Sequence, residues 1–231
     1  MLDVILMNNL EILYEDNHII VVVKPCNILS QEDSTKDPDM LTIIKEYIKV
    51  KYNKPGNVYL GLVHRLDRPV SGIMVFAKTS KAASRLSNEM KENNFSKKYL
   101  AVVHDNLLKS NDTFIDYILK SDNGNSIVTN EKNGKYSELS YNVVDKQNKL
   151  ALVNIELLTG RHHQIRIQFA SRNCPLYGDW RYGKKDSNKL YLHAYELTFK
   201  HPITKEYMTF NKYPDLDNNI WSLFNLRKMT N

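Results

Sequence analysis

The chain of 231 residues is long enough to bury one large core or two small ones, and it has too little Gly and Pro for a fibrous or low-complexity protein. Its first ten residues lack the features of a signal peptide, and its longest aliphatic run, IIVVV from Ile19, is too short to cross a bilayer. Cys26 and Cys174 lack the spacing of a disulfide framework or a zinc site, and a net charge of +6 is compatible with a polyanionic partner. We therefore expect a soluble, cytoplasmic protein.

The first predicted strands and the first predicted helix fall within residues 12–52. Residues 12–25, ILYEDNHIIVVVKP, predict two short strands around a turn at 15–18, because β-branched and aromatic residues flank turn formers. Residues 39–52 predict a helix, since apolar side chains recur there at helical spacing after Asp39, which can cap the helix.

The stretch HRLDRPVSG, residues 64–72, is predicted to form a loop between two strands. Apolar runs at 58–63 and 72–77 flank it on either side. Pro69 disfavours a helical conformation at the residue before it, and Gly72 permits the backbone angles of a tight turn.

The rest of the chain contains more predicted strands than helices. Apolar and β-branched runs predict strands at 97–103, 113–119, 126–130, 137–144, 150–158, 189–199 and 206–210. Helices are expected from Thr79 or Ser80 to near Asn93, just after Arg161, and over residues 220–224. This pattern predicts an α+β fold with a mixed, largely antiparallel sheet and flanking helices.

The helix predicted after the TGR triplet would carry Ile165 and Phe169 on one face, with Arg166 facing elsewhere. His162 and His163 are adjacent, so on a helix their side chains would diverge by about 100° and form a poor pair of metal ligands. A P-loop or dinucleotide-binding fingerprint is also absent from the sequence. We therefore expect neither a metal nor a cofactor.

Basic charge is concentrated in two segments of the chain. Residues 159–185 hold six basic residues against one acid, and residues 64–81 hold four against one. The same two segments hold the most unusual short motifs, which favours a polyanionic partner such as a nucleic acid.

Asp67, the carboxylate of the 64–72 loop, has arginines at positions 65 and 68. It can be one half of a structural ion pair that fixes the loop. It can equally be a carboxylate that guanidinium groups keep ionised, so that it acts as a nucleophile or a base at neutral pH. The loop position and the arginine-rich stretch at 157–170, where a helix start favours phosphate oxygens, favour the second interpretation.

Five stretches, in this order and spacing, resemble motifs of the RluA-type pseudouridine synthases: ILYEDNHIIVVVKP, HRLDRPVSGIMVFAKT, KKYLAVV, LLTGRHHQIR and CPLYGD. The resemblance runs from about Leu10 to about Phe210. The residues Arg68-Pro69-Val70 replace a lysine-acidic-threonine sequence that is frequent in the family, and His162 replaces a common threonine. Both changes bear on substrate preference and leave the aspartate in place.

The resemblance implies an enzyme that isomerises a uridine to pseudouridine within structured ribosomal or transfer RNA, in a central active-site cleft. By the same resemblance, Asp67 is the catalytic aspartate and Arg166 is the basic residue that pairs with it. Tyr99 matches the active-site tyrosine, which packs against the uracil and can remove its carbon-bound proton. Whether Asp67 attacks the anomeric carbon or deprotonates the adjacent ribose carbon stays open.

Three further residues match positions that contact the RNA. Arg65 resembles the arginine that fills the gap left by a flipped-out uridine, and a planar guanidinium stacks well on bases. Arg161 is expected to contact phosphates, and Leu192 to lie against the other face of the base. Tyr99 and Leu192 are also compatible with an ordinary place in the core of a sheet.

Two alternatives remain beside the synthase. One is a non-catalytic RNA-binding or assembly factor on the same scaffold, which the presence of Asp67, Tyr99 and Arg166 disfavours. The other is an RNA hydrolase that uses Asp67 with a metal, which the lack of clustered acids disfavours. We expect one catalytic domain over residues 1–231 without a separate N-terminal RNA-binding module, a monomer, and RNA as the partner.

Overall fold

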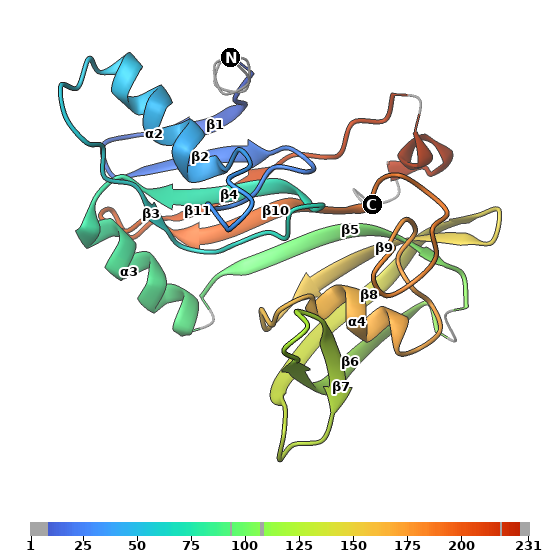
Figure 1. The fold of residues 1–231 in the computed structure, drawn as a ribbon. Helices are drawn as coiled ribbons and strands as arrows, with labels where there is room; N and C mark the ends of the chain where they lie inside the picture. The colour runs from blue at the N-terminus through green and yellow to red at the C-terminus, as the bar shows by residue number, and fades with distance from the viewer. Residues whose placement is uncertain (1–8, 93, 107–108, 218, 227–231) are drawn as a thin grey trace. The chain divides into compact units, whose positions relative to one another are not determined.

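The computed structural model describes residues 9–92, 94–106, 109–217 and 219–226, which divide between two compact units (Figure 1). Unit 1 comprises residues 1–95 and 196–212, and unit 2 comprises residues 96–195 and 213–231. Within the described residues, no helix combines the length and the apolar character that a membrane span requires.

Unit 1 is built on a small antiparallel sheet with two helices. Its elements are β1 (Ile12–Glu15), β2 (Ile19–Lys24), α2 (Met40–Lys51), β3 (Gly61–Leu62), β4 (Ser71–Ala77), α3 (Ser80–Lys91), the second half of β10 (Leu192–Lys200) and β11 (Tyr207–Asn211). Strand β2 pairs with β1 and β4, β3 pairs with β4, and β11 pairs with β10, all antiparallel. The strands predicted around the 15–18 turn are confirmed, whereas β3 is much shorter than the predicted strand at 58–63.

The two helices of unit 1 begin where the sequence predicts. The Asp39 carboxylate accepts a hydrogen bond from the Thr42 N–H at 3.2 Å, and the Thr79 hydroxyl accepts one from the Ala82 N–H at 3.1 Å. Such caps satisfy N–H groups that the first turn of a helix leaves without intrahelical partners. Helix α3 then places Ala82 and Leu86 in the core of unit 1, whose other members are Ile19, Val21, Ile73, Val75, Ala77, Phe95, Leu197 and Phe199.

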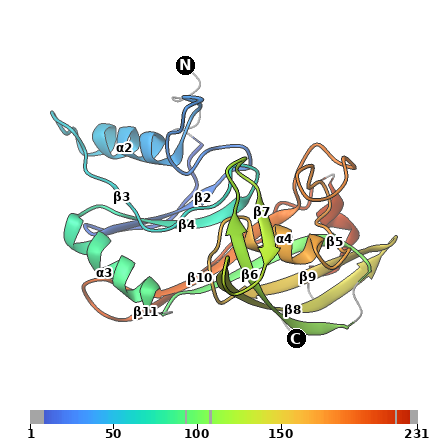
Figure 2. The same cartoon turned by 60° about the horizontal axis from the view of Figure 1, so that its bottom comes forward.

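The strands of unit 2 also pair antiparallel, with one helix beside them. Its elements are β5 (Ser96–His104), β6 (Asn111–Lys120), β7 (Ser126–Thr129), β8 (Lys135–Gln147), β9 (Leu150–Leu157), α4 (Gln164–Ala170), the first half of β10 and the 3₁₀ helix η1 (Ile220–Leu223). The strand order is β5-β9-β8-β6-β7, and every neighbouring pair is antiparallel. Helix α4 lies beside the β6–β7 hairpin (Figure 2).

Aromatic side chains fix α4 against this sheet. The Phe169 ring of α4 lies 5.1 Å from the Phe114 ring and 5.4 Å from the Tyr141 ring, measured between centroids. All three side chains are buried, as is Ile165. The predicted apolar face of the helix is therefore confirmed, and the fold class, α+β with largely antiparallel strand pairing, is confirmed as well.

Two details of the predicted start of α4 are wrong. Helix α4 begins at Gln164, because His163 adopts a left-handed backbone conformation with φ of 54°. The two histidines therefore precede the helix, and their rings stack at 3.7 Å between centroids instead of diverging. Arg166, in the first turn of α4, is buried for a reason given below. The short helix expected at 220–224 is present as a single 3₁₀ turn.

Candidate active site

The loop at residues 63–70 carries Asp67 between β3 and β4 of unit 1, as the sequence predicts. The Ser30 hydroxyl donates to the Leu66 carbonyl at 2.7 Å and accepts from the Leu66 N–H at 3.1 Å. The Val70 N–H donates to the Asp67 carbonyl at 3.0 Å, which closes a turn directly after the aspartate. Leu66 and Val70 are buried and Asp67 is half-buried, so the residues around the carboxylate are anchored.

A buried lysine ties β2 to the same loop. Lys24 is 0% exposed, and its ammonium group donates to the carbonyls of Pro25 at 2.9 Å, Ile28 at 2.6 Å and Arg68 at 3.1 Å. These three acceptors match the three donors of an ammonium group. Burial lowers the pKa of Lys24 to about 7, and the negative charge of Asp67 acts in the opposite direction.

Sequence reasoning did not single out Lys24. One feature of the sequence could have indicated it: Lys24 is the charged residue that ends the otherwise apolar run IIVVVK. A side chain at the end of such a buried strand is expected to be buried as well. Lysine is almost never fully buried without partners, so such a position predicts a specific set of acceptors.

The two arginines that flank Asp67 are both exposed. The Arg68 guanidinium forms an ion pair with Asp37 at 2.7 Å, and their side chains are 45% and 41% exposed. An ion pair this open to water contributes little to stability. Bonds to backbone groups from Ser30 and Lys24 hold the loop, and Arg65 is accessible to a ligand, as its predicted contact with RNA requires.

In unit 2, Arg166 forms a buried, bidentate ion pair with Asp179. Its Nε donates to Asp179 Oδ2 at 2.8 Å and its Nη2 to Oδ1 at 2.7 Å, and the side chains are only 7% and 1% exposed. Asp179 Oδ1 also accepts from the N–H groups of Arg181 at 3.0 Å and Tyr182 at 3.2 Å. The partner explains why Arg166 turns inward. The sequence places Asp179 as the one acid of a basic segment and as the last residue of the CPLYGD stretch, but its pairing with Arg166 was not predicted.

A network of aromatic and histidine side chains supports Arg166. The Arg166 guanidinium lies 5.2 Å from the centroid of the Tyr182 ring. The Tyr182 hydroxyl accepts from the Ser126 N–H at 2.7 Å and lies 2.7 Å from His163 Nδ1. The Ser126 hydroxyl donates to the His162 carbonyl at 2.6 Å and lies 3.0 Å from Nδ1 of the same residue. The β6–β7 hairpin and the turn before α4 thus hold Tyr182 in place.

The other predicted site residues of unit 2 occupy two kinds of position. Tyr99 on β5 and Leu192 at the start of β10 are 6% and 4% exposed. Arg161 is exposed, and its Nε donates to the Tyr136 carbonyl at 2.8 Å. Arg161 is therefore accessible to a ligand and is oriented by its bond to Tyr136. Tyr99 and Leu192 are predicted to contact the base, and both lie on strands with their side chains buried.

The predicted residues divide between the two units. Unit 1 contains Asp67 and Arg65, and unit 2 contains Tyr99, Arg161, Arg166 and Leu192. Across the described ranges, no group of three or more His, Cys, Asp or Glu side chains is placed to hold a metal ion.

Comparison with known proteins assigns the family. The model of a family described as RNA pseudouridylate synthase matches residues 18–171, more than half of the chain. The chain belongs to this family. The resemblance drawn from the sequence motifs is thereby confirmed, and the matched stretch of the pseudouridylate synthase family includes Asp67, Tyr99 and Arg166.

Individual relatives agree with this assignment. The chain is 34% identical over 217 residues to "Ribosomal large subunit pseudouridine synthase C" of Buchnera aphidicola subsp. Baizongia pistaciae, an alignment that covers 87% of this chain and 66% of the relative. It is 33% identical to the protein of the same name from Buchnera aphidicola subsp. Schizaphis graminum, again over 217 residues, with 88% and 66% covered. The chain thus spans just under two thirds of the length of these relatives.

A solved structure shares the fold. "Human RNA Pseudouridylate Synthase Domain Containing 4" superposes on this synthase-family chain with a TM-score of 0.77 over 93% of each chain, at 20% sequence identity.

Proposed function

We propose that the protein isomerises uridine to pseudouridine in structured ribosomal or transfer RNA, with Asp67 as the essential carboxylate. The observation that carries the proposal is the environment of Asp67. This half-buried aspartate lies within the stretch that matches the pseudouridylate synthase family. Ser30 and the buried Lys24 hold its loop in place through hydrogen bonds to backbone carbonyls.

The reaction needs only one carboxylate. The bond from the base nitrogen to the ribose breaks, the uracil turns, and a bond from a ring carbon to the same ribose carbon forms. That ring carbon loses a proton and the nitrogen gains one, so no water is consumed. Glycoside hydrolases generally require a second carboxylate, either to protonate the leaving group or to activate water. A leaving base that stays bound as a stabilised anion removes this requirement.

Asp67 acts in this proposal either as a nucleophile at the anomeric carbon or as a base on the adjacent ribose carbon. Arg166 keeps the carboxylate ionised and oriented. The rigidity of Arg166 supports this role, because its bonds to Asp179 and the Tyr182 ring fix the guanidinium before any substrate binds. A preoriented charge stabilises its partner without reorganisation at the moment of reaction.

The uracil itself is assigned to Tyr99 and Leu192. Tyr99 packs against the base and removes the carbon-bound proton, while Leu192 lies against the opposite face. Their burial supports this assignment, since a dry surface favours stacking of a base and keeps water from the reacting carbon.

A stacked uridine must leave its helix before the reaction, at a cost of roughly a few kcal/mol. Arg65 occupies the gap that the flipped base leaves, and Arg161 contacts phosphates without reading sequence. The exposure of both arginines supports these contacts. Binding of RNA should accordingly weaken steeply with salt.

The proposal treats the chain as one catalytic domain that acts as a monomer in the cytoplasm, without a cofactor.

The test is a map of pseudouridines in total cellular RNA, with and without the gene. Loss of specific ribosomal or transfer RNA pseudouridines on deletion, and their return on complementation, is the expected result. An unchanged map would contradict the proposal and favour a non-catalytic RNA-binding factor.

A further inference from the structure

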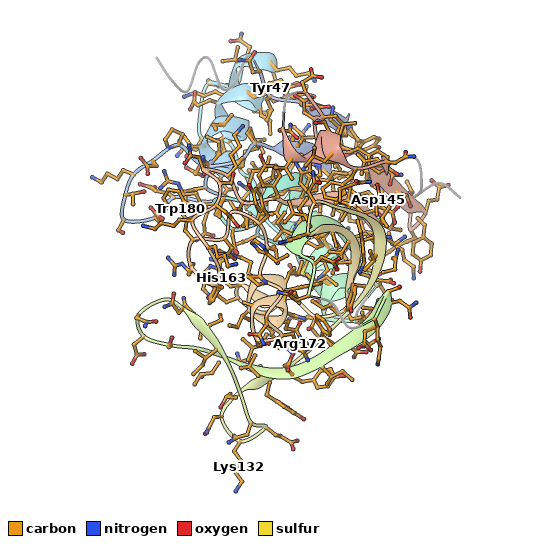
Figure 3. All side chains as sticks on the ribbon, turned by 90° about the vertical axis from the view of Figure 1, so that its right-hand side faces the viewer. Tyr47, Lys132, Asp145, His163, Arg172 and Trp180 are labelled. Carbon is orange, nitrogen blue, oxygen red and sulfur yellow. The ribbon has the colours of Figure 1, made fainter. Side chains whose placement is uncertain are left out.

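The loop at residues 178–189 of unit 2 presents an exposed tryptophan among basic side chains. Trp180 is 54% exposed. The loop also carries Arg181, Lys184, Lys185 and Lys189, and its only acidic residues are Asp179, which is buried with Arg166, and Asp186. In Figure 3, Trp180 lies on the same side of unit 2 as His163, and Asp145 lies on the opposite side.

The indole is held in place although it is exposed. Trp180 Nε1 donates to the Ser187 carbonyl at 2.5 Å, and Lys185 Nζ lies 5.3 Å from the centroid of the Trp180 ring. A rigid aromatic ring loses little conformational entropy when a ligand stacks on it.

The loop that carries the indole is itself fixed. The Asp186 carboxylate accepts from the Gly178 N–H at 2.7 Å and lies 2.7 Å from His104 Nε2. Gly178 has a φ of +76°, and a Cβ there would lie 1.8 Å from the Lys189 carbonyl oxygen, so only glycine permits this close approach. The two ends of the loop are therefore held together, and the tip is preorganised.

Nothing in the described part of the chain covers the indole with another ring, since Trp180 takes part in none of its aromatic pairs. A largely exposed tryptophan marks a ligand-binding surface more often than an exposed small side chain does, because tryptophan is enriched at binding hot spots. The neighbouring cationic side chains indicate which kind of ligand binds here. Lys184 and Lys185 can bind phosphates, and the indole can stack on the flat face of a base.

We infer that Trp180 is a stacking platform for an unpaired base of the RNA substrate, with Lys184 and Lys185 contacting the adjacent phosphates. The inference rests on the proposed function and extends it to a nucleotide beside the target uridine. Residues 179 and 182 of the same loop hold Arg166, so a base on Trp180 lies next to the proposed active site of unit 2. Residues 180–189 contain no aliphatic side chain, which disfavours insertion into a lipid surface.

Tryptophan fluorescence tests the contact directly. Titration with a short single-stranded oligouridylate should quench the emission of the wild type. Trp180→Phe removes this signal and leaves the buried Trp221 as the only tryptophan. The quench should therefore disappear in that variant, while its affinity, measured by anisotropy of a labelled oligouridylate, should stay close to that of the wild type.

The affinity of Trp180→Ala should fall roughly tenfold, because stacking of one base on an aromatic side chain is worth about that factor. Tyr207→Ala is the matched control. Tyr207 is 65% exposed and lies 5.1 Å from Lys200 Nζ, but it belongs to β11 of unit 1. Its replacement should leave the affinity unchanged. Equal affinities of Trp180→Ala and the wild type, or a quench that persists in Trp180→Phe, would overturn the inference.

Two further measurements separate this inference from the proposed function and from other partners. Vesicles containing phosphatidylserine should leave the Trp180 emission unchanged, and a blue shift with vesicles but no quench with RNA would overturn the inference. In single-turnover reactions with unmodified ribosomal RNA below its dissociation constant, Trp180→Ala should form pseudouridine roughly tenfold more slowly than the wild type, whereas the control Tyr207→Ala should match the wild type. Absence of pseudouridine formation by the wild type would contradict the proposed function, whereas a wild type that forms pseudouridine but shows no quench would contradict only the stacking role.

Discussion

Two regions of the molecule hold a proposed catalytic side chain, and they do so by different means. In unit 1, side chains bind the backbone of the Asp67 loop, through Ser30 and the ammonium group of Lys24. In unit 2, side chains bind one another, and the guanidinium of Arg166 is fixed by Asp179 and the Tyr182 ring. The first arrangement fixes the path of the loop that carries the carboxylate, whereas the second binds the charged group itself.

This difference between the units predicts that unit 2, with its buried Arg166–Asp179 pair, depends on ionic pairing for its stability more than unit 1 does. Substitution Asp179→Asn removes the buried, bidentate carboxylate partner of Arg166 and should lower the free energy of unfolding by about 3–5 kcal/mol. The control is Asp37→Asn, which breaks the exposed pair with Arg68 and should cost less than about 1 kcal/mol. Urea unfolding of both variants provides the comparison. Equal losses would show that burial of the Arg166 pair does not matter.

Lys24 allows a sharper test in unit 1. Substitution Lys24→Met leaves the carbonyls of Pro25 and Ile28 without the ammonium donor and removes one of two donors from the Arg68 carbonyl, at roughly 1–3 kcal/mol for each buried acceptor left unpaired that water does not reach. The variant should therefore be less stable and less active at neutral pH. A matched substitution, Lys45→Met on α2, should have no effect on either property.

The effect of Lys24 on the free energy of unfolding should also depend on pH. Its pKa is about 7 in the folded protein and near 10.5 in the unfolded chain, so the unfolded state binds more protons between these values. The contribution of Lys24 to the free energy of unfolding should therefore rise from about pH 7 to pH 10.5 and stay constant below pH 7. The difference between wild type and Lys24→Met, measured by urea unfolding across this range, isolates the contribution. A difference that is independent of pH would contradict the lowered pKa.

The smallest expected effect concerns the hydroxyl that joins Ser126 and His163. Substitution Tyr182→Phe keeps the ring under Arg166 and removes the acceptor of the Ser126 N–H, which should cost about 1 kcal/mol. Tyr136→Phe, whose exposed hydroxyl donates to Glu138 at 2.6 Å, is the control and should be close to neutral. Urea unfolding resolves such a difference, and a neutral Tyr182→Phe would mean that the hydroxyl does not support the network.

The sequence predicted those features that depend on neighbours along the chain. The caps Asp39 and Thr79 bind N–H groups three residues later, and the strands follow from runs of β-branched residues. The features that were missed depend on distant partners. Lys24 meets the carbonyl of Arg68, 44 residues away, and Arg166 meets Asp179 across a turn.

The start of α4 shows the same limit on a smaller scale. The left-handed conformation of His163 accompanies a contact of its own ring with the Tyr182 hydroxyl and contacts of its neighbour His162 with Ser126, so local propensity placed the helix start too early. The positions of Asp67, Tyr99 and Arg166 in the chain were available from motifs, while the pairing of the arginine with Asp179 and with the Tyr182 ring was not.

The central claim is that Asp67 carries out the chemistry, and the most direct test is single-turnover pseudouridine formation by Asp67→Asn. The substitution keeps the size of the side chain and removes its charge, while the backbone bonds from Ser30 and Lys24 preserve the loop. The account predicts no product above background, with RNA affinity and the free energy of unfolding close to those of the wild type. Appreciable pseudouridine formation by Asp67→Asn would contradict it.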